Sequence, residues 1–303
     1  MTNQFSLIGA PCSAGAHAPG QEKAPAELRE AGLIESFSEA GLEIKDHGDL
    51  PEYRYRSDPT NPRARNIADV VANARRVADF VADALERGDR YVVLGGDCTN
   101  GVGAVAGATR DPNIRTGVIY LDMHGDMNTP KAVGSGALDW MGVAHMLGAK
   151  DTIPEYAGLD GRSPLIDDNQ IVFLGWNFKG SNSNHEREEM IRRRMNVVFL
   201  DELQDDPQAA VQRAFDLLGK VDRIVVHFDV DVIDFADCPL GENYRHGEGC
   251  TLEQAAVALS EMVNNQAFSG VTVAQLNPDH GEAEQVTLKR FSNAFSKALA
   301  GSL

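Results

Sequence analysis

Residues 117–128 read GVIYLDMHGDMN, an apolar run that ends in polar side chains at alternate positions. The run at 117–121 carries no charge, which is typical of a strand buried on both faces of a parallel sheet. In an extended chain, residues two apart point the same way, so Asp122, His124 and Asp126 can converge on one point. The stretch therefore predicts a buried strand that ends in a cluster of potential metal ligands.

Short apolar runs of this kind recur along the whole chain and alternate with amphipathic stretches. The clearest helical stripe spans 67–86 and stops at Gly88, and Thr251 with Gln254 forms a capping-box signature for a helix at 252–262. Together with 117–121, the predicted strands are 5–8, 43–46, 91–94, 171–174, 197–200, 224–228 and 271–276.

This alternation predicts a three-layer α/β/α sandwich around a mostly parallel, eight-stranded sheet. No linker rich in proline, glycine or serine divides the chain, so we expect one domain over residues 1–303. The polar stretch 51–62 contains three prolines and is predicted to be an excursion over the surface.

The net charge of −17 argues against nucleic acid or an anionic membrane surface as a partner, because phosphates would be repelled. The four cysteines are scattered without a CxxC spacing, which favours a reduced compartment over a disulfide framework. The first residues do not form a signal peptide, and no apolar run approaches the length of a membrane span. We therefore expect a cytoplasmic protein whose partner is neither nucleic acid nor a membrane surface.

Two other predicted strands also end in polar clusters. The strand at 91–94 runs into Gly95-Gly96-Asp97-Cys98, and the strand at 224–228 runs into Asp229-Val230-Asp231. Ligands of open α/β sheets collect beyond the carboxyl ends of the strands, so these clusters should meet. A single aspartate in a loop is usually a cap or turn residue, but four carboxylates at one edge would repel each other unless cations neutralise them. The clusters predict a site for Mn²⁺ or a similar divalent ion.

These motifs resemble those of the arginase/agmatinase (ureohydrolase) family, and the resemblance extends over nearly the whole chain. Three segments are similar to the family's metal motifs: 95–98, 122–130 and 228–231. The opening blocks 8–11, 22–33 and 45–51 resemble arginase proper more than agmatinase. The resemblance implies hydrolysis of a C–N bond in a guanidino or related amidine compound, and a homotrimer or homohexamer.

The resemblance also implies two Mn²⁺ ions per chain, bridged by Asp122 and Asp229. Asp126 and Cys98 would complete one site, and His124 and Asp231 the other. Two such ions lower the pKa of a bridging water and deliver hydroxide to an sp² carbon. Asp126 is therefore also predicted to act in catalysis, whereas Asp97 is expected to shape the turn.

Three positions depart from the family pattern. Cys98 stands where the family has a metal-binding histidine, so either the metal is held differently or Cys98 lies beside a half-vacant site. Asp139 stands where a histidine transfers protons, and it can act as an acid at neutral pH only if burial raises its pKa. His145 is a nearby substitute, although a histidine on a helical pattern is more often part of the core or the surface.

Gln275 replaces a glutamate that pairs with the guanidinium of the substrate, and the lost charge removes about 1.5–3 kcal/mol of binding. Together these departures favour a less basic substrate, such as an N-hydroxyguanidine or an amidine. By the same resemblance, Asn128 and Ser135 would bind the carboxylate of an amino-acid tail on the substrate. The family's acidic loop after the fifth strand is not reproduced, and Glu186 is a candidate to supply its carboxylate. Gln275 is predicted to act in both catalysis and substrate binding.

Two alternatives remain open. The first is a metal-dependent deacylase of similar fold, which uses one Zn²⁺ and a His-His pair; no adjacent histidines occur in this sequence. The second is a catalytically silent relative that acts as a structural or regulatory subunit, because three working positions are altered.

Overall fold

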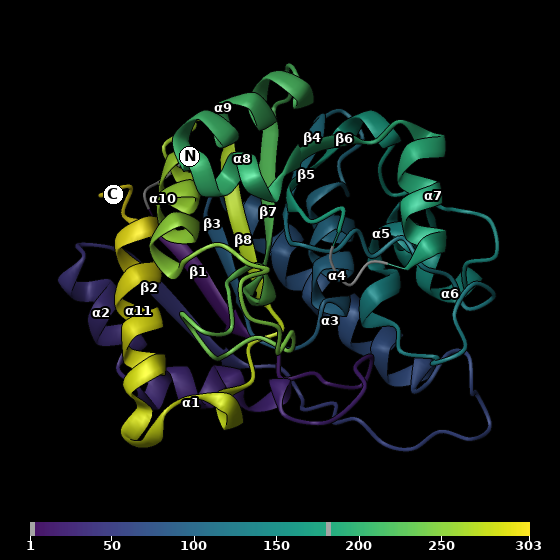
Figure 1. Cartoon of the computed structure of the whole chain (residues 1–303), viewed down its shortest axis with the longest axis horizontal. Coiled ribbons are helices and arrows are strands. Elements are labelled where there is room, and N and C mark those ends of the chain that lie inside the picture. Colours follow the sequence, from purple (N-terminus) through teal and green to yellow (C-terminus); the bar gives the residue numbers. More distant parts are fainter. Residues whose placement is uncertain (1–3, 180–182) are drawn as a thin grey trace.

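The computed structural model describes residues 4–179 and 183–303, and it contains one eight-stranded sheet in which all neighbouring strands are parallel (Figure 1). The order across the sheet is β2-β1-β3-β8-β7-β4-β5-β6. The strands are β1 Gln4–Gly9, β2 Glu43–Asp49, β3 Arg90–Leu94, β4 Thr116–Leu121, β5 Ile171–Trp176, β6 Asn196–Phe199, β7 Arg223–Asp229 and β8 Phe268–Ala274. The predicted fold class is confirmed.

Helices cover both faces of the sheet, and each face has its own hydrophobic core (Figure 1). One face packs against α1 Ala24–Glu30, α2 Leu33–Glu39, α8 Leu200–Asp205, α9 Pro207–Leu218, α10 Leu252–Val263 and α11 Val286–Leu299. The other packs against α3 Ile67–Glu86, α4 Thr99–Ala108, α5 Gly142–Met146, α6 Pro154–Ala157 and α7 Asn184–Arg193. Because the central strands are buried on both faces, they carry continuous apolar runs instead of alternating ones.

The two helices with the strongest sequence signals lie where they were predicted. α3 spans Ile67–Glu86 and buries its valine-rich stripe. α10 begins with the capping box, in which Thr251 Oγ1 accepts from the Gln254 backbone N–H and Gln254 Oε1 accepts from the Thr251 backbone N–H. The segment 51–62 forms an irregular, largely exposed excursion, as predicted.

Glycines on α4 allow it to approach α3 closely. A Cβ at Gly107 would lie 2.3 Å from the Ala78 carbonyl oxygen, and one at Gly103 would lie 2.5 Å from that of Ala74. α4 therefore packs deep against α3, with its amino end over the middle of the sheet.

The strand order gathers loops that are far apart in the sequence. β3, β8, β7 and β4 are consecutive neighbours, so the segments after residues 94, 121, 229 and 274 leave the same edge side by side. In the described part of the chain, no helix has the length and apolar character needed to cross a membrane.

Candidate metal centre and active site

The turn after β3 is built by two glycines in the left-handed region. Gly95 and Gly96 have φ values of 80° and 87°, and a Cβ at Gly96 would collide with Asn100 Nδ2 at 2.1 Å. The Asp97 carboxylate accepts hydrogen bonds from the backbone N–H groups of Gly15 and Thr99. Asp97 is thus a turn residue, and it directs the next residue, Cys98, toward the centre of the sheet edge.

Four buried side chains at the ends of β3, β7 and β4 form the inner ligand group: Cys98, Asp122, His227 and Asp229. One ligand atom from each lies within 4.8 Å of the others. The Cys98 thiol donates to Asp229 Oδ2 at 2.8 Å. Burial raises the pKa of Cys98 well above its ordinary value, and the nearby Asp229 carboxylate raises it further. Burial likewise raises the pKa of Asp229, with help from Asp231 and Asp122.

A second set, the outer ligand group, shares Asp122 and adds His124 and Asp231. His124 Nδ1 lies 3.3 Å from Asp122 Oδ1 and 3.3 Å from Asp231 Oδ2. Burial alone would lower the pKa of His124, but Asp231 and Asp122 outweigh it and raise the pKa well above its ordinary value. Burial raises the pKa of Asp122 to about 6.

The donor atoms in these two groups fit divalent cations. Asp122 Oδ2 and Asp231 Oδ1 are buried and have no hydrogen-bond partner within residues 4–179 and 183–303. Buried carboxylate oxygens are costly to leave unpaired, and a metal ion satisfies them while it offsets their mutual repulsion. The shared Asp122 joins the two groups, so the arrangement suits two adjacent ions.

Asp126 lies beside these groups and belongs to neither of them. Its Oδ2 accepts a hydrogen bond from Tyr120 Oη at 2.5 Å, and its backbone has a φ of 48°, an uncommon conformation for an aspartate. Burial raises the pKa of Asp126 well above its ordinary value, and Asp122 adds to the effect. Its predicted roles in metal binding and catalysis stay predictions.

A cavity of about 420 Å³ opens over the metal-binding side chains, a size that suits a small metabolite. Its lining comprises His17, Ala18, Gln21, Cys98, His124, Asp126, Asp139, Trp140, Glu186, Asp229, Asp231, Glu242, Asn243, Tyr244 and Gln275. Carboxylates line several sides of it, so the cavity suits a polar substrate with hydrogen-bond donors.

Comparison with known proteins identifies the family. The family model "Arginase family" matches residues 3–300. The chain belongs to the arginase family. It is 29% identical to arginase-1 of Sus scrofa over 306 residues, which cover 99% of this chain and 92% of that protein. It is 30% identical to mitochondrial arginase-2 of Homo sapiens over 296 residues, or 93% and 80% of the two chains.

The fold agrees with this membership. The solved structure of arginase from Bacillus subtilis subsp. subtilis str. 168 has a TM-score of 0.84 and 25% identity, with 98% of each chain covered. Arginase-family hydrolases act on C–N bonds in amidines and guanidines. The metal-binding groups lie at the edge of the sheet where its strands end, which is where an α/β fold places its active site.

Two departures from the arginase pattern contact each other in the cavity wall. Gln275 Nε2 donates to Asp139 Oδ2 at 3.2 Å, and Gln275 Oε1 accepts from Gln21 Nε2 at 3.1 Å. Burial raises the pKa of Asp139 to about 7. Asp139 therefore has the burial-raised pKa that it needs to act as an acid at neutral pH.

The three residues predicted to bind the substrate's tail lie in different surroundings. Glu186 is buried in the first turn of α7, lines the cavity, and accepts from the Met127 backbone N–H at 3.0 Å. Asn128 and Ser135 are not among the lining residues. Asn128 Oδ1 accepts from Ser183 Oγ at 2.5 Å, and Ser135 is half-buried in the loop that follows.

His145 is a core residue. Its Nδ1 lies 2.7 Å from the Met141 carbonyl oxygen, and its Nε2 accepts from the Ile153 backbone N–H at 3.0 Å. Burial lowers its pKa to about 4. With both ring nitrogens engaged and no position in the cavity lining, His145 does not substitute for the missing proton-transfer histidine.

Sequence reasoning missed several residues that the structure brings to the site. The rings of His17 and Trp140 contact edge to face, with their centroids 5.0 Å apart. Glu242 and Tyr244 come from the long loop at 234–249. His227 was overlooked because it lies inside a predicted strand. The available signal was its position two residues before Asp229, which places both side chains on the same face.

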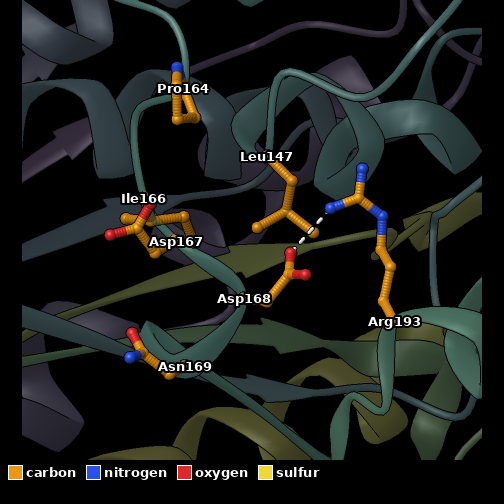
Figure 2. A pocket seen from close by; sticks show the side chains of 7 residues that line it. All are labelled: Leu147, Pro164, Ile166, Asp167, Asp168, Asn169 and Arg193. Carbon is orange, nitrogen blue, oxygen red and sulfur yellow. Dashed lines mark hydrogen bonds and ion pairs between the residues drawn. The ribbon is translucent and has the colours of Figure 1, made fainter.

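A second cavity, of about 430 Å³, lies far from this chemistry, where β5 begins (Figure 2). Asp168 and Arg193 face each other across it, and their side chains form an ion pair at 2.7 Å. Arg193 also pairs with Glu189. Asp168 and Arg193 in the lining of this cavity are therefore already paired, and the cavity is not part of the metal centre.

Proposed function

We propose that this arginase-family protein hydrolyses a C–N bond in a guanidino or amidine compound that is less basic than arginine. One observation carries the proposal: two metal-binding groups share Asp122 beneath a cavity whose wall holds the uncharged Gln275 against Asp139. The carboxylate-rich centre supports hydrolysis, and the altered wall argues for a different substrate.

The metal ligands are proposed from the family resemblance. By it, Cys98, Asp122, Asp126 and Asp229 would hold one ion, and His124 and Asp231 would hold the other together with Asp122 and Asp229. Manganese is the ion that the family resemblance implies, and carboxylate and imidazole ligands suit it. When bound, the ions supply an activated water and neutralise the cluster of aspartates.

Gln275 would select the charge of the substrate. Its amide already donates to Asp139 and accepts from Gln21, so it offers no anionic partner to a guanidinium. A charge-assisted hydrogen bond is worth about 1.5–3 kcal/mol, and an arginine-like cation loses that amount here. A neutral or weakly basic amidine loses less, because it carries less positive charge.

Asp139 would protonate the leaving nitrogen. Because burial raises its pKa to about 7, a large fraction of this carboxyl holds a proton at neutral pH. A group whose pKa lies near the working pH is an effective general acid. The hydrogen bond from Gln275 Nε2 fixes the orientation of this carboxyl within the cavity wall.

An amino-acid tail on the substrate is also proposed. Glu186 lies in the cavity lining with a buried carboxylate, which suits an ammonium group. Asn128 and Ser135 would bind the tail's carboxylate by the family resemblance; the bond between Asn128 and Ser183 would have to open for that contact.

The remaining expectations are proposals about the whole protein. One domain over residues 1–303 is supported by the interleaving of early and late strands in a single sheet. A homotrimer or homohexamer, and a cytoplasmic location, stay predictions. Light scattering of the purified protein measures the assembly, and fractionation of the source cells measures the location.

Substrate profiling of manganese-loaded protein tests the proposed function. Arginine, agmatine, N-hydroxyarginine, guanidinobutyrate and formiminoglutamate are compared by the nitrogen product released. We expect the highest kcat/KM with an N-hydroxyguanidine or an amidine. Arginine as the best substrate by a wide margin would contradict the proposed specificity, and no turnover of any compound by metal-loaded protein would support a silent subunit.

A further inference from the structure

His227 lies inside the sheet as a member of the inner ligand group. It is 2% exposed, and neither ring nitrogen has a hydrogen-bond partner among the residues that the structure describes. Its ring stacks on that of Tyr120, its register partner on β4, with centroids 4.2 Å apart and an interplanar angle of 13°. The stack holds the imidazole by its face, so a nitrogen on the edge of the ring can bind a ligand.

The fold makes room for this imidazole. α4 begins directly above it, and the residue that faces the ring is Gly101. A Cβ at Gly101 would lie 2.4 Å from His227 Nδ1, a distance that real atoms do not adopt. Glycine at this position therefore allows the histidine to sit under the amino end of the helix.

One unpartnered nitrogen of His227 belongs to the inner ligand group. One His227 nitrogen lies within 4.8 Å of Cys98 Sγ and of one carboxylate oxygen each from Asp122 and Asp229. A buried imidazole without a hydrogen bond is costly, and three potential ligands around it are the arrangement that a metal ion satisfies. His227 directly precedes the 228–231 segment that resembles the family motif, and the resemblance assigns it no role.

We propose that Cys98, Asp122, His227 and Asp229 form a metal site that selects Zn²⁺ or another thiolate-binding ion over Mn²⁺. The proposal rests on the metal centre of the proposed function and changes the nature of its inner ion. Thiolate and imidazole are ligands that Zn²⁺ prefers, and Mn²⁺ prefers oxygen. An imidazole lost at position 98 is thereby supplied from β7.

Charge supports the same assignment. The Cys98 thiol donates to Asp229 Oδ2 at 2.8 Å, so a metal ion that binds the sulfur has to replace that proton. An ion that binds thiolate strongly displaces that proton, whereas a harder ion competes poorly with it. The outer ligand group, with Asp122, His124 and Asp231, carries no sulfur and stays suited to Mn²⁺.

Cobalt and zinc binding to the full-length protein test the proposal without an activity assay. Metal-free protein is titrated with Co²⁺, and thiolate-to-cobalt charge-transfer absorption is recorded. The protein is also dialysed against equal Zn²⁺ and Mn²⁺, and its metal content is measured. We expect a charge-transfer band that disappears in Cys98→Ser, and about one bound zinc per chain, as for a site with a coordinating thiolate.

Two variants isolate the histidine. His227→Phe keeps the stacked ring and should lose the inner ion while it keeps the outer one. Gly101→Ala keeps every ligand but displaces the imidazole, and should weaken zinc binding by about tenfold or more. His47→Phe, an exposed histidine on the edge strand β2, is the matched control and should change neither.

The outcomes separate this proposal from the proposed function. A folded His227→Phe protein that keeps both ions and the wild-type cobalt spectrum would overturn the proposal while leaving amidine hydrolysis intact. A His227-dependent zinc site in a protein that turns over no amidine would overturn the proposed function alone. If His227→Phe does not fold, anomalous diffraction of zinc-loaded wild-type crystals decides. An ion about 2.0–2.1 Å from a His227 nitrogen supports the proposal, and its absence there refutes it.

Discussion

Gln275 donates from Nε2 to Oδ2 of Asp139 at 3.2 Å, and both side chains are buried in the wall of the cavity. Burial holds the pKa of Asp139 at about 7, and the nearby Glu242 carboxylate adds to the rise. Burial raises the pKa of Asp97 to about 7, and the charge of the Asp139 carboxylate adds to that rise. Two positions that depart from the arginase pattern thus form one unit, in which an uncharged amide contacts a carboxyl that holds its proton near neutrality.

The pH dependence of kcat should follow Asp139. Its raised pKa means that the carboxyl is protonated below about pH 7 and loses its proton above it. If the protonated form donates to the leaving nitrogen, kcat of metal-saturated protein should fall above about pH 7. Asp139→Asn should lower kcat by about 10²–10⁴-fold and remove this alkaline limb. An unchanged pH profile in the variant would assign the proton transfer to another group.

Replacing Gln275 by glutamate should shift specificity toward cations. In Gln275→Glu, a guanidinium gains a charge-assisted partner, so kcat/KM for arginine relative to a neutral amidine should rise by about 10- to 100-fold. The new carboxylate lies against Asp139 and should raise the pKa of that group further. Steady-state assays with both substrates measure the ratio within one variant, and an unchanged ratio would remove Gln275 from substrate selection.

Glu186 should act on binding more than on chemistry. Glu186→Gln keeps an oxygen for the Met127 backbone N–H but loses the charge offered to a substrate ammonium. We expect KM to rise by about tenfold with little change in kcat. Glu188→Gln, which changes an exposed glutamate on the same helix, is the control and should change neither parameter. Equal kinetics for the two variants would argue against an amino-acid tail.

Asp122 should control the binding of both ions because it belongs to both ligand groups. Metal loading should raise the Tm of the wild-type protein, with about 2.7 kcal/mol of stabilisation at a hundredfold excess over Kd. Asp122→Asn should abolish that gain. In the absence of metal, the variant should be the more stable protein, because one of several repelling carboxylates is gone. Thermal melts with and without chelator measure both effects.

The close contact between α3 and α4 should be intolerant of any added atom. Gly107→Ala should lower the free energy of unfolding by about 2 kcal/mol, because separating two backbones costs more than the ~1 kcal/mol that alanine gains over glycine in a helix. Gly134→Ala lies in open space and should be nearly neutral. Denaturant unfolding compares the two, and equal stabilities would show that α4 moves freely away from α3.

The strands and their polar ends could be predicted because the cause is local. A strand buried on both faces needs an apolar run, and the first aspartate marks where it leaves the core, as at Leu121 and Asp122. β8 was placed a few residues late: it spans Phe268–Ala274, because Ser269 and Gly270 interrupt the apolar pattern and Gln275, with a φ of 60°, ends the strand.

The rest of the site depends on packing between distant segments. His17, Glu242 and Tyr244 reach the cavity from irregular loops whose paths follow no periodic pattern. His227 lies inside a predicted strand; its spacing from Asp229 indicates the face of the sheet, but the stack on Tyr120 and the space at Gly101 appear only in the folded chain. The raised pKa of Asp139 likewise comes from burial, which a sequence does not display.

The order of strands in the sheet also constrains when the metal centre can come into existence. β3 and β4 deliver Cys98 and Asp122, yet they are separated in the sheet by β7 and β8, which the ribosome makes later. A nascent chain that ends before residue 223 therefore lacks His227, Asp229 and Asp231 and has a gap where the centre belongs. Both ligand groups can be complete only after β7 has been made and paired with β4, so metal binding reports that this part of the sheet has formed.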